Sequence, residues 1–154
     1  MRIDYLADHP EFLPMLAQWH HDKWGYTRPG ESAEARAARM KPLCGHEEIP
    51  TVFVAFSGST LFGSAMLIAN DMDTRKELTP WLAGVFVAPE RRRQGIGSVL
   101  IERVVECAAK LGVATLYLYT PDAERLYARL GWRPVERTPY RGAEVLIMRR
   151  EITA

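Results

Sequence analysis

The stretch Gly84-Val-Phe-Val-Ala-Pro-Glu-Arg-Arg-Arg-Gln-Gly-Ile-Gly-Ser-Val-Leu100 decides the fold of this chain. Its first residues belong to an apolar run, Trp81–Val87, which predicts a buried strand. Pro89 has no N–H to donate and therefore ends strand pairing. After a basic turn, an amphipathic helix is predicted from Gly95 or Ile96 onward. Its expected apolar face consists of Ile96, Val99, Leu100, Val104, Cys107, Ala108 and Leu111.

The junction between this strand and this helix predicts an anion site. The first N–H groups of a helix lack partners inside it, and the helix dipole places partial positive charge there. Gly95 and Gly97 have no side chains, so an anion can approach the backbone closely, and Arg91–Arg93 add cationic groups. We therefore expect a phosphate or pyrophosphate site. The glycine spacing alone is equally compatible with an ordinary helix cap beside a solvated basic turn.

Two common nucleotide motifs fit this junction less well. A Walker loop needs a lysine after its second glycine, and Ser98 follows Gly97 here. A dinucleotide fingerprint needs a third glycine and an acidic residue at the end of the next strand. That strand ends in Tyr119-Thr120 instead. Both motifs are disfavoured.

Two motifs together resemble the GCN5-related N-acetyltransferases. Val87-Ala-Pro89 followed by Arg92-Arg-Gln-Gly95-Ile-Gly97 is similar to the acyl-CoA-binding motif of that family. Downstream, Ala123-Glu-Arg-Leu-Tyr127-Ala-Arg-Leu-Gly131-Trp132 is similar to its late helix. The resemblance extends from about Ile49 to Glu151. It implies acetyl-CoA as the acyl donor, bound where two parallel strands splay apart. The residues that it assigns to the donor are Phe86 and Val87 through their backbone, and Arg92, Gln94, Gly95, Ile96, Gly97, Ser98 and Thr120.

The resemblance also assigns a catalytic acid. Tyr127 matches the family tyrosine that protonates the departing CoA thiolate, and a phenol with an ordinary pKa near 10 carries that proton at neutral pH. Packing in the core beside Leu126 and Leu130 is the alternative role. The family often has asparagine where this chain has Thr120, so the contact of that residue with CoA is in doubt.

The general base has no clear candidate. Many members of the family carry glutamate on the strand before the glycine turn, and the matching residue here is Ala83. Segments that could border the amine site contain Asp71, Asp73, Glu77 and Glu48, but for each residue alone a solvated loop charge is the favoured interpretation. No histidine has the spacing of a metal ligand, so no metal site is expected. The acidic Asp71–Glu77 segment slightly favours a cationic acceptor.

The remaining elements predict an α+β fold. Its sheet is expected to be mixed and mostly antiparallel, with a splayed parallel strand pair and helices on both faces. Ser32 is predicted to cap a helix, and Pro121 to begin another after Thr120. The expected strands are Arg2–Leu6, Thr51–Phe56, Leu61–Ala69, Trp81–Val87, Ala114–Tyr119, one near Val135, and Glu144–Arg150. The expected helices are Pro10–Trp24, Ala33–Met40, the one starting near Gly95, and one ending before Gly131.

Composition predicts one domain spanning residues 1–154 in a cytoplasmic protein. The chain is 47% hydrophobic and 25% charged, which is typical of an ordinary globular domain. A net charge of +1 gives no reason to expect nucleic acid or a membrane as a partner. Cys44 and Cys107 are expected to be reduced thiols. Homodimerisation stays open.

These features predict an N-acetyltransferase that moves an acetyl group from acetyl-CoA to a primary amine of a small molecule. Transfer would be direct, in a ternary complex, without a cysteine nucleophile. Two alternatives remain at this stage. One is a protein N-terminal or lysine acetyltransferase, which would need an open acceptor face. The other is a non-catalytic acyl-CoA-binding sensor domain, which the alanine at position 83 suggests.

Overall fold

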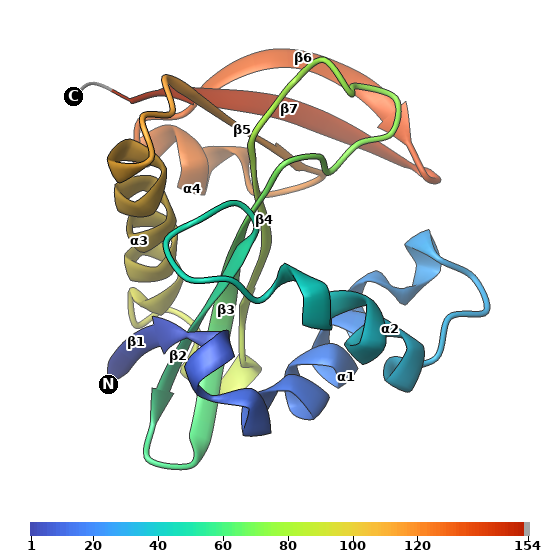
Figure 1. The fold of residues 1–154 in the computed structure, drawn as a ribbon. Helices are drawn as coiled ribbons and strands as arrows, with labels where there is room; N and C mark the ends of the chain where they lie inside the picture. The colour runs from blue at the N-terminus through green and yellow to red at the C-terminus, as the bar shows by residue number, and fades with distance from the viewer. Residues whose placement is uncertain (153–154) are drawn as a thin grey trace.

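The structure, a computed structural model, describes residues 1–152, and Figure 1 shows how a seven-stranded sheet with helices on both faces is built from them. The strands are β1 (Arg2–Tyr5), β2 (Thr51–Ser57), β3 (Thr60–Ile68), β4 (Trp81–Val87), β5 (Thr115–Thr120), β6 (Arg133–Tyr140) and β7 (Ala143–Glu151). The helices are α1 (Leu13–Trp24), α2 (Ala33–Met40), α3 (Ile96–Lys110) and α4 (Glu124–Arg129). Short 3-10 turns lie at Leu6–Asp8, Pro10–Phe12, Gly25–Thr27, Lys41–Leu43 and Pro89–Arg91.

The strand order is β1-β2-β3-β4-β5-β7-β6, and every neighbouring pair is antiparallel except β4 and β5. The parallel pair results from the crossover through α3, as the strand–helix–strand pattern predicts. Each face of the sheet carries its own core. Helices α3 and α4 cover a cluster that includes Phe53, Leu67 and Leu118, while α1 and α2 cover one that includes Val54 and Ile147. The predicted fold class is confirmed.

The predicted cap of α2 and the predicted buried strand that begins at Trp81 are also confirmed. The Ser32 hydroxyl accepts a hydrogen bond from Ala35 N and caps α2 (3.0 Å). The hairpin between β2 and β3 turns at Gly58. Trp81 is fully buried in the core. The ends of most strands shift by one residue from the expected bounds, since pairing with neighbours rather than composition sets them.

Three details of the helices differ from the expectation. Val99 is exposed because the face of α3 that meets the sheet is centred on Ile101, Val104 and Ala108, nearly opposite to it. Leu111 is exposed because α3 ends one residue before it. Pro121 does not begin α4; the helix starts three residues later, after a turn capped by the Thr120 hydroxyl.

An extra residue in β4 separates it from β5. Ser64 of β3 pairs with Phe86, but Met66 pairs with Ala83, so two residues of β4 lie opposite one residue of β3. This is a β-bulge, which bends a strand and increases its twist. Gly84 lies within it at a φ of 59°. Beyond the bulge β4 follows β3, and the only pair of residues that β4 shares with β5 among the described residues is Trp81 with Tyr117. The two parallel strands therefore diverge.

The glycine in the bulge is required for two separate reasons, and a matched pair of substitutions distinguishes them. Gly58 has nearly the same φ, 56°, but a Cβ there would meet nothing within 4 Å. A Cβ on Gly84 would lie 2.5 Å from Met66 Sδ and 3.2 Å from His20 Cε1. Gly58→Ala should therefore cost only the left-handed backbone, about 1–2 kcal/mol. Gly84→Ala should cost about 1–3 kcal/mol more, because it overpacks the core. Urea denaturation measures both, and equal losses would contradict the steric part.

Candidate active site

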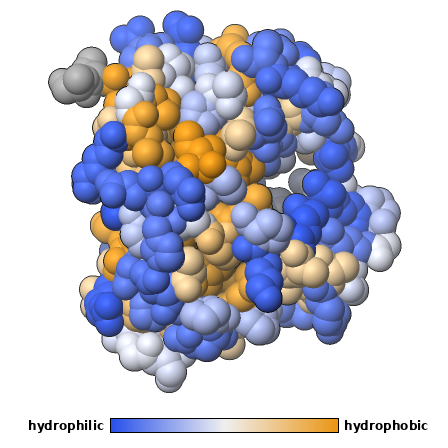
Figure 2. Space-filling model, viewed as in Figure 1, coloured by the Kyte–Doolittle hydropathy of each residue, from blue (hydrophilic) through white to orange (hydrophobic). Residues whose placement is uncertain are grey.

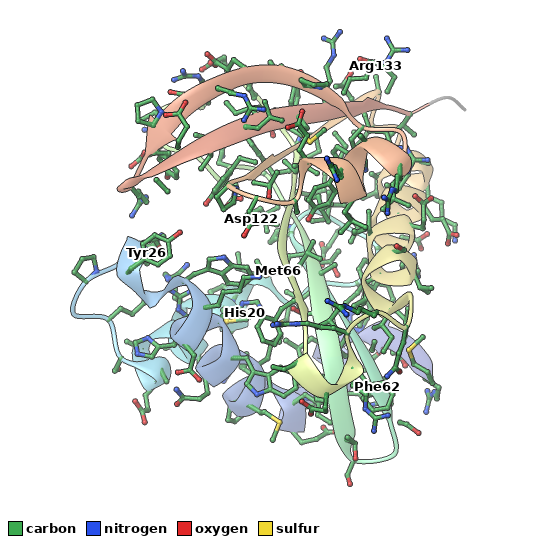
Figure 3. All side chains as sticks on the ribbon, turned by 180° about the vertical axis from the view of Figure 1, so that it is seen from behind. His20, Tyr26, Phe62, Met66, Asp122 and Arg133 are labelled. Carbon is green, nitrogen blue, oxygen red and sulfur yellow. The ribbon has the colours of Figure 1, made fainter. Side chains whose placement is uncertain are left out.

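The divergence of β4 and β5 forms the first half of the candidate site. Tyr117 N donates to Pro80 O (3.0 Å), and beyond this point β5 pairs with β7 only. From the bulge onward, the edge of β4 that faces β5 has no strand partner within the described residues, and of its backbone groups the Val87 carbonyl accepts a hydrogen bond from Arg92. Unpaired backbone groups at a strand edge are available to an extended ligand. In Figure 3, Asp122 approaches this gap from the side of β5, while Met66 and His20 lie on the opposite side.

Two buried side chains hold the bulge. The Ser64 hydroxyl donates to the carbonyl of Gly84 (2.8 Å), and His20 Nε2 lies 3.0 Å from Ser64 Oγ. Since the only hydroxyl proton is used on Gly84, His20 Nε2 must carry a proton and donate it to Ser64. Burial, assisted by Arg36, Lys23 and Arg39, lowers the pKa of His20 to about 3. The imidazole is therefore neutral at physiological pH and acts as a fixed donor.

The N-terminus of α3 lies at the end of this gap and carries free donors. Gly95 is the N-cap, so no side chain caps the helix. The first hydrogen bond of the helix runs from Val99 N to Gly95 O (3.1 Å). Within the described residues, the N–H groups of Ile96, Gly97 and Ser98 have no acceptor. Three free amides at a helix start, with open space over the glycine, suit an anion.

The basic residues before α3 point to different places. Arg92 Nε donates to the carbonyl of Val87 (3.1 Å), and its guanidinium lies 5.8 Å from the centre of the Phe86 ring. Arg92 is thereby held at the rim of the gap. The guanidinium of Arg91 instead stacks on Phe62, 4.2 Å from the ring centre. Gln94 is exposed in the same turn, and the side chain of Ile96 is buried, so Ile96 can offer only its N–H.

The two β4 residues expected to contact the donor through their backbone face opposite ways. The Phe86 carbonyl lies directly against Gly63 of β3 and is turned away from the gap. Because the N–H and C=O groups of successive residues point to alternate edges of a strand, the backbone groups of Val85 and Val87 point toward the gap instead. The Phe86 ring packs under α1, 5.4 Å from Trp19 and 6.3 Å from Trp24. The bulge changes the direction in which the backbone groups and side chains after Gly84 point, and the spacing of residues in the sequence did not reveal this change.

Tyr127 lies on α4 with its ring at the edge of the core. Its ring centre is 6.0 Å from that of Trp132, and only 8% of the residue is exposed. Burial, with a smaller contribution from Asp122, raises the pKa of Tyr127 to about 12. The phenol keeps its proton at any physiological pH, and its oxygen has no hydrogen-bond partner within residues 1–152. The nearby Thr120 hydroxyl accepts from Asp122 N (3.3 Å) and Ala123 N (3.0 Å), so it caps the turn before α4.

A cavity of about 380 Å³ forms the second half of the candidate site. It lies between the loop after β3, the turn of the β6–β7 hairpin and the segment after α1. Figure 2 shows the molecule hollowed between this hairpin and the helices, with hydrophilic residues on both sides, and in Figure 3 Tyr26 faces the hairpin from the α1 side. The lining residues are Arg28, Asn70, Asp71, Met72, Asp73, Lys76, Tyr140 and Arg141.

Arg141 connects the segments that line this cavity. Its guanidinium donates to Thr27 O (2.7 Å) and to the Tyr140 hydroxyl (2.9 Å), and it lies 3.3 Å from Asp73 Oδ2. One side chain thus connects the segment after α1, the hairpin turn and the loop after β3. The result is a bounded pocket. Neither Arg141 nor the two tyrosines of this region, Tyr119 and Tyr140, had a sequence signal, because each belongs to an ordinary strand or turn.

Asp71 is the one acidic side chain of the cavity that makes no hydrogen bond or ion pair with residues 1–152. Burial raises the pKa of Asp71 to about 7, against the opposing effect of Arg141, Arg28 and Arg39. Burial raises the pKa of Tyr119 as well, with smaller contributions from Asp71, Tyr140 and Tyr26. Of the other expected acidic residues, Asp73 lines the cavity and forms an ion pair with Arg141. Glu77 and Glu48 do not line it.

Neither a cluster of metal ligands nor a membrane-spanning helix is found within residues 1–152. Within residues 1–152, no three His, Cys, Asp or Glu side chains gather closely enough to hold a metal ion. In the same range, no helix has the length and apolar character that crossing a membrane requires.

The fold and the glycine turn define a family, and the chain belongs to it: the model of the acetyltransferase (GNAT) family matches residues 13–132. Similar solved structures agree. An aminoglycoside 6'-N-acetyltransferase complexed with coenzyme A has a TM-score of 0.78 at 19% identity, with 100% of this chain and 98% of that chain covered. The aminoglycoside 6'-N-acetyltransferase from Enterococcus faecium has a TM-score of 0.76 at 18% identity, with 100% of this chain and 98% of that chain covered.

A third structure, from Salmonella typhimurium and solved with its cofactor acetyl-CoA, has a TM-score of 0.72 at 17% identity, with 100% of this chain and 95% of that chain covered. At these identities the likeness demonstrates the fold. A comparison with curated proteins finds no match.

The raised pKa of Asp71 predicts a pH-dependent gain from its removal. A carboxyl that ionises near pH 4 when unfolded and near pH 7 when folded destabilises the fold once it is charged. Wild-type protein should therefore lose stability between about pH 4 and 7, by at most about 4 kcal/mol. Asp71→Asn should melt higher than wild type at pH 8 and show no such advantage at pH 4. Asp73→Asn, which removes a carboxylate paired with Arg141, is the control. Parallel melting curves of wild type and Asp71→Asn across this range would contradict the assignment.

Proposed function

We propose that this protein is an acetyl-CoA-dependent N-acetyltransferase whose acceptor is a primary amine of a small molecule, and that the chain works as a single domain. One observation carries the proposal: β4 and β5 diverge beside a helix N-terminus with three free amides and Arg92. Coenzyme A offers an extended pantetheine arm for the strand edge and a pyrophosphate for the amides. The presence of CoA or acetyl-CoA in two structures of the same fold supports this donor.

Chemistry proceeds by direct transfer from donor to acceptor. The free amine attacks the thioester carbonyl, a C–N bond forms, and the C–S bond breaks. A backbone N–H of the bulge, at Gly84 or Val85, is suited to stabilise the oxyanion, because Ser64 and His20 hold this segment rigidly. No cysteine is needed. Cys107 lies on the buried face of α3, and burial raises its pKa.

Tyr127 serves the departing thiolate as a hydrogen-bond donor. The pKa of this phenol is about 12, whereas an ordinary thiol has a pKa of about 8.5. Complete proton transfer to a thiolate is therefore uphill by about 5 kcal/mol before the complex compensates for it. The phenol can still stabilise the developing negative charge on sulfur, which then takes its proton through Tyr127 from the amine or from solvent.

The bounded pocket supports a small acceptor over a protein. Arg141 crosses the cleft to Thr27 and Asp73, and a lysine on a protein surface would have to reach past that connection. The rival that Ala83 suggests, a non-catalytic acyl-CoA sensor, has a simple test. Steady release of CoA with any amine would exclude it. Acetyl-CoA binding without turnover would support it.

The free amides at α3 predict how acetyl-CoA binding depends on Gly97. Acetyl-CoA at one hundred times its dissociation constant should stabilise the wild-type protein by about 2.7 kcal/mol, seen as a higher melting temperature. Gly97→Val adds a side chain where the pyrophosphate would lie. Its Cβ is 3.6 Å from Val87 Cγ2, an ordinary contact, so the unliganded fold should persist. We expect the variant to melt like wild type alone and to lose the shift with acetyl-CoA. Equal shifts would mean that the glycines form only a helix cap.

The phenol of Tyr127 can be tested with the smallest possible change. Tyr127→Phe removes one oxygen that has no partner in the described structure, so stability should change by about 1 kcal/mol or less. If the phenol stabilises the thiolate, kcat should fall by roughly a hundredfold while the KM for acetyl-CoA stays nearly constant. Rates come from thiol release at saturating acetyl-CoA. A kcat within threefold of wild type would remove Tyr127 from the mechanism.

A further inference from the structure

We propose that the cavity between the loop after β3 and the β6–β7 turn binds the acceptor, and that this acceptor is an amine that also carries an anionic group, such as a free amino acid, rather than a polycation. The inference rests on the proposed function and deepens it. It concerns the charges of the pocket, which neither the family nor the fold determines.

The cavity lies beside the place where the acetyl group would be held. Trp81 of β4 is in register with Tyr117 of β5, so two residues further along Tyr119 is level with Ala83, just before the bulge. The Tyr119 ring is 6.2 Å from Trp81 and 5.5 Å from Tyr140. Tyr140 lines the cavity. An aromatic wall thus leads from the donor gap to the cavity on the α1 and α2 face of the sheet.

Asp71 is suited to receive the amine. Asp71 is partly buried, and a desolvated carboxylate without a partner is costly; an ammonium group supplies both an opposite charge and hydrogen-bond donors. Position 83, where many members of the family carry glutamate, is alanine here, so β4 supplies no carboxylate at that place. A carboxyl with a pKa of about 7 is also able to take up a proton near neutral pH.

The proton and bond changes balance with Asp71 as the base. The ammonium transfers one proton to the Asp71 carboxylate, and the free amine forms the C–N bond as the C–S bond breaks. A second amine proton leaves as the amide forms, and the thiolate gains one proton through Tyr127 or solvent. Asp71 then returns its proton to solvent. No oxidant, metal or further co-reactant is needed.

The cations of the cavity give the second half of the specificity. Three cationic side chains and two carboxylates line it. Arg141 is matched by Asp73, at 3.3 Å, and by Thr27 O. Arg28 and Lys76 have no ion pair within residues 1–152. With Asp71 reserved for the amine, the remaining charge is positive and calls for an anion on the acceptor. A polycation would place its additional ammonium groups against Arg28 and Lys76.

The test compares acceptors that differ only in the anionic group. The full chain, saturated with acetyl-CoA, is assayed by thiol release with L-amino acids, with their carboxamides, and with the polycationic aminoglycoside kanamycin. We expect kcat/KM for the preferred amino acid to exceed that for its carboxamide by tenfold or more. The double substitution Arg28→Gln with Lys76→Gln should abolish this preference by lowering kcat/KM for the amino acid toward that for its carboxamide. Glu77→Gln, in the same loop but outside the cavity, should change neither.

Asp71→Asn tests the amine end. Its kcat/KM should fall at least a hundredfold, with the acetyl-CoA thermal shift intact, and the rise in rate through pH 7 should disappear. A normal rate for this variant would overturn the role of Asp71. Equal use of acid and carboxamide, or kanamycin as the best acceptor, would overturn the acceptor class and leave the proposed function standing. If no acceptor releases CoA although acetyl-CoA binds, the proposed function fails and this inference fails with it.

Discussion

The hydrogen bond from the Ser64 hydroxyl to the Gly84 carbonyl, supported by neutral His20, fixes the extra residue in β4. The rest of the site depends on that residue. Before it, the side chains of Trp81 and Ala83 face α1 and α2. After it, the side chain of Phe86 faces them, so odd-numbered residues point to these helices before the bulge and even-numbered residues after it. The bend removes β4 from β5, which opens the donor gap and brings the start of α3 to its end. Without the bulge, the two parallel strands would pair along their length and leave no backbone free.

Burial sets the charge state of the titratable groups around this gap. It lowers the pKa of His20 and raises those of Tyr127 and Asp71, because each charged form loses hydration in the interior. His20 and Tyr127 are consequently neutral hydrogen-bond donors near pH 7. Asp71 is the exception, since three arginines limit its shift and leave it close to half-ionised. One physical effect thus yields two fixed donors and one group able to exchange a proton.

Charge is also what distinguishes the two halves of the site. At the start of α3 the donor half presents backbone amides and Arg92, a positive environment suited to phosphates. The acceptor half mixes signs, with Asp71 unpaired among Arg28, Lys76 and Arg141. Similar folds at 18–19% identity carry aminoglycoside acetyltransferase names. In our proposal this cavity binds the acceptor, and its Arg28 and Lys76, which have no ion pair within the described residues, would disfavour a polycationic amine. Similarity of fold at these identities does not determine the acceptor.

The sequence by itself determined the β4–turn–α3 unit, its two glycines, the parallel crossover to β5 and the position of Tyr127 on a late helix, because these depend on contacts between near neighbours. Only the tertiary structure decided the bulge, the exposure of Val99, the directions in which the carbonyl and the ring of Phe86 point, and the cavity lined by Asp71 and Arg141. His20 and Ser64 are 44 residues apart, and Arg141 meets Thr27 across 114 residues. Local periodicity carries no information about such contacts, since they form only when separate elements pack, and the same packing gives Asp71 its unusual pKa.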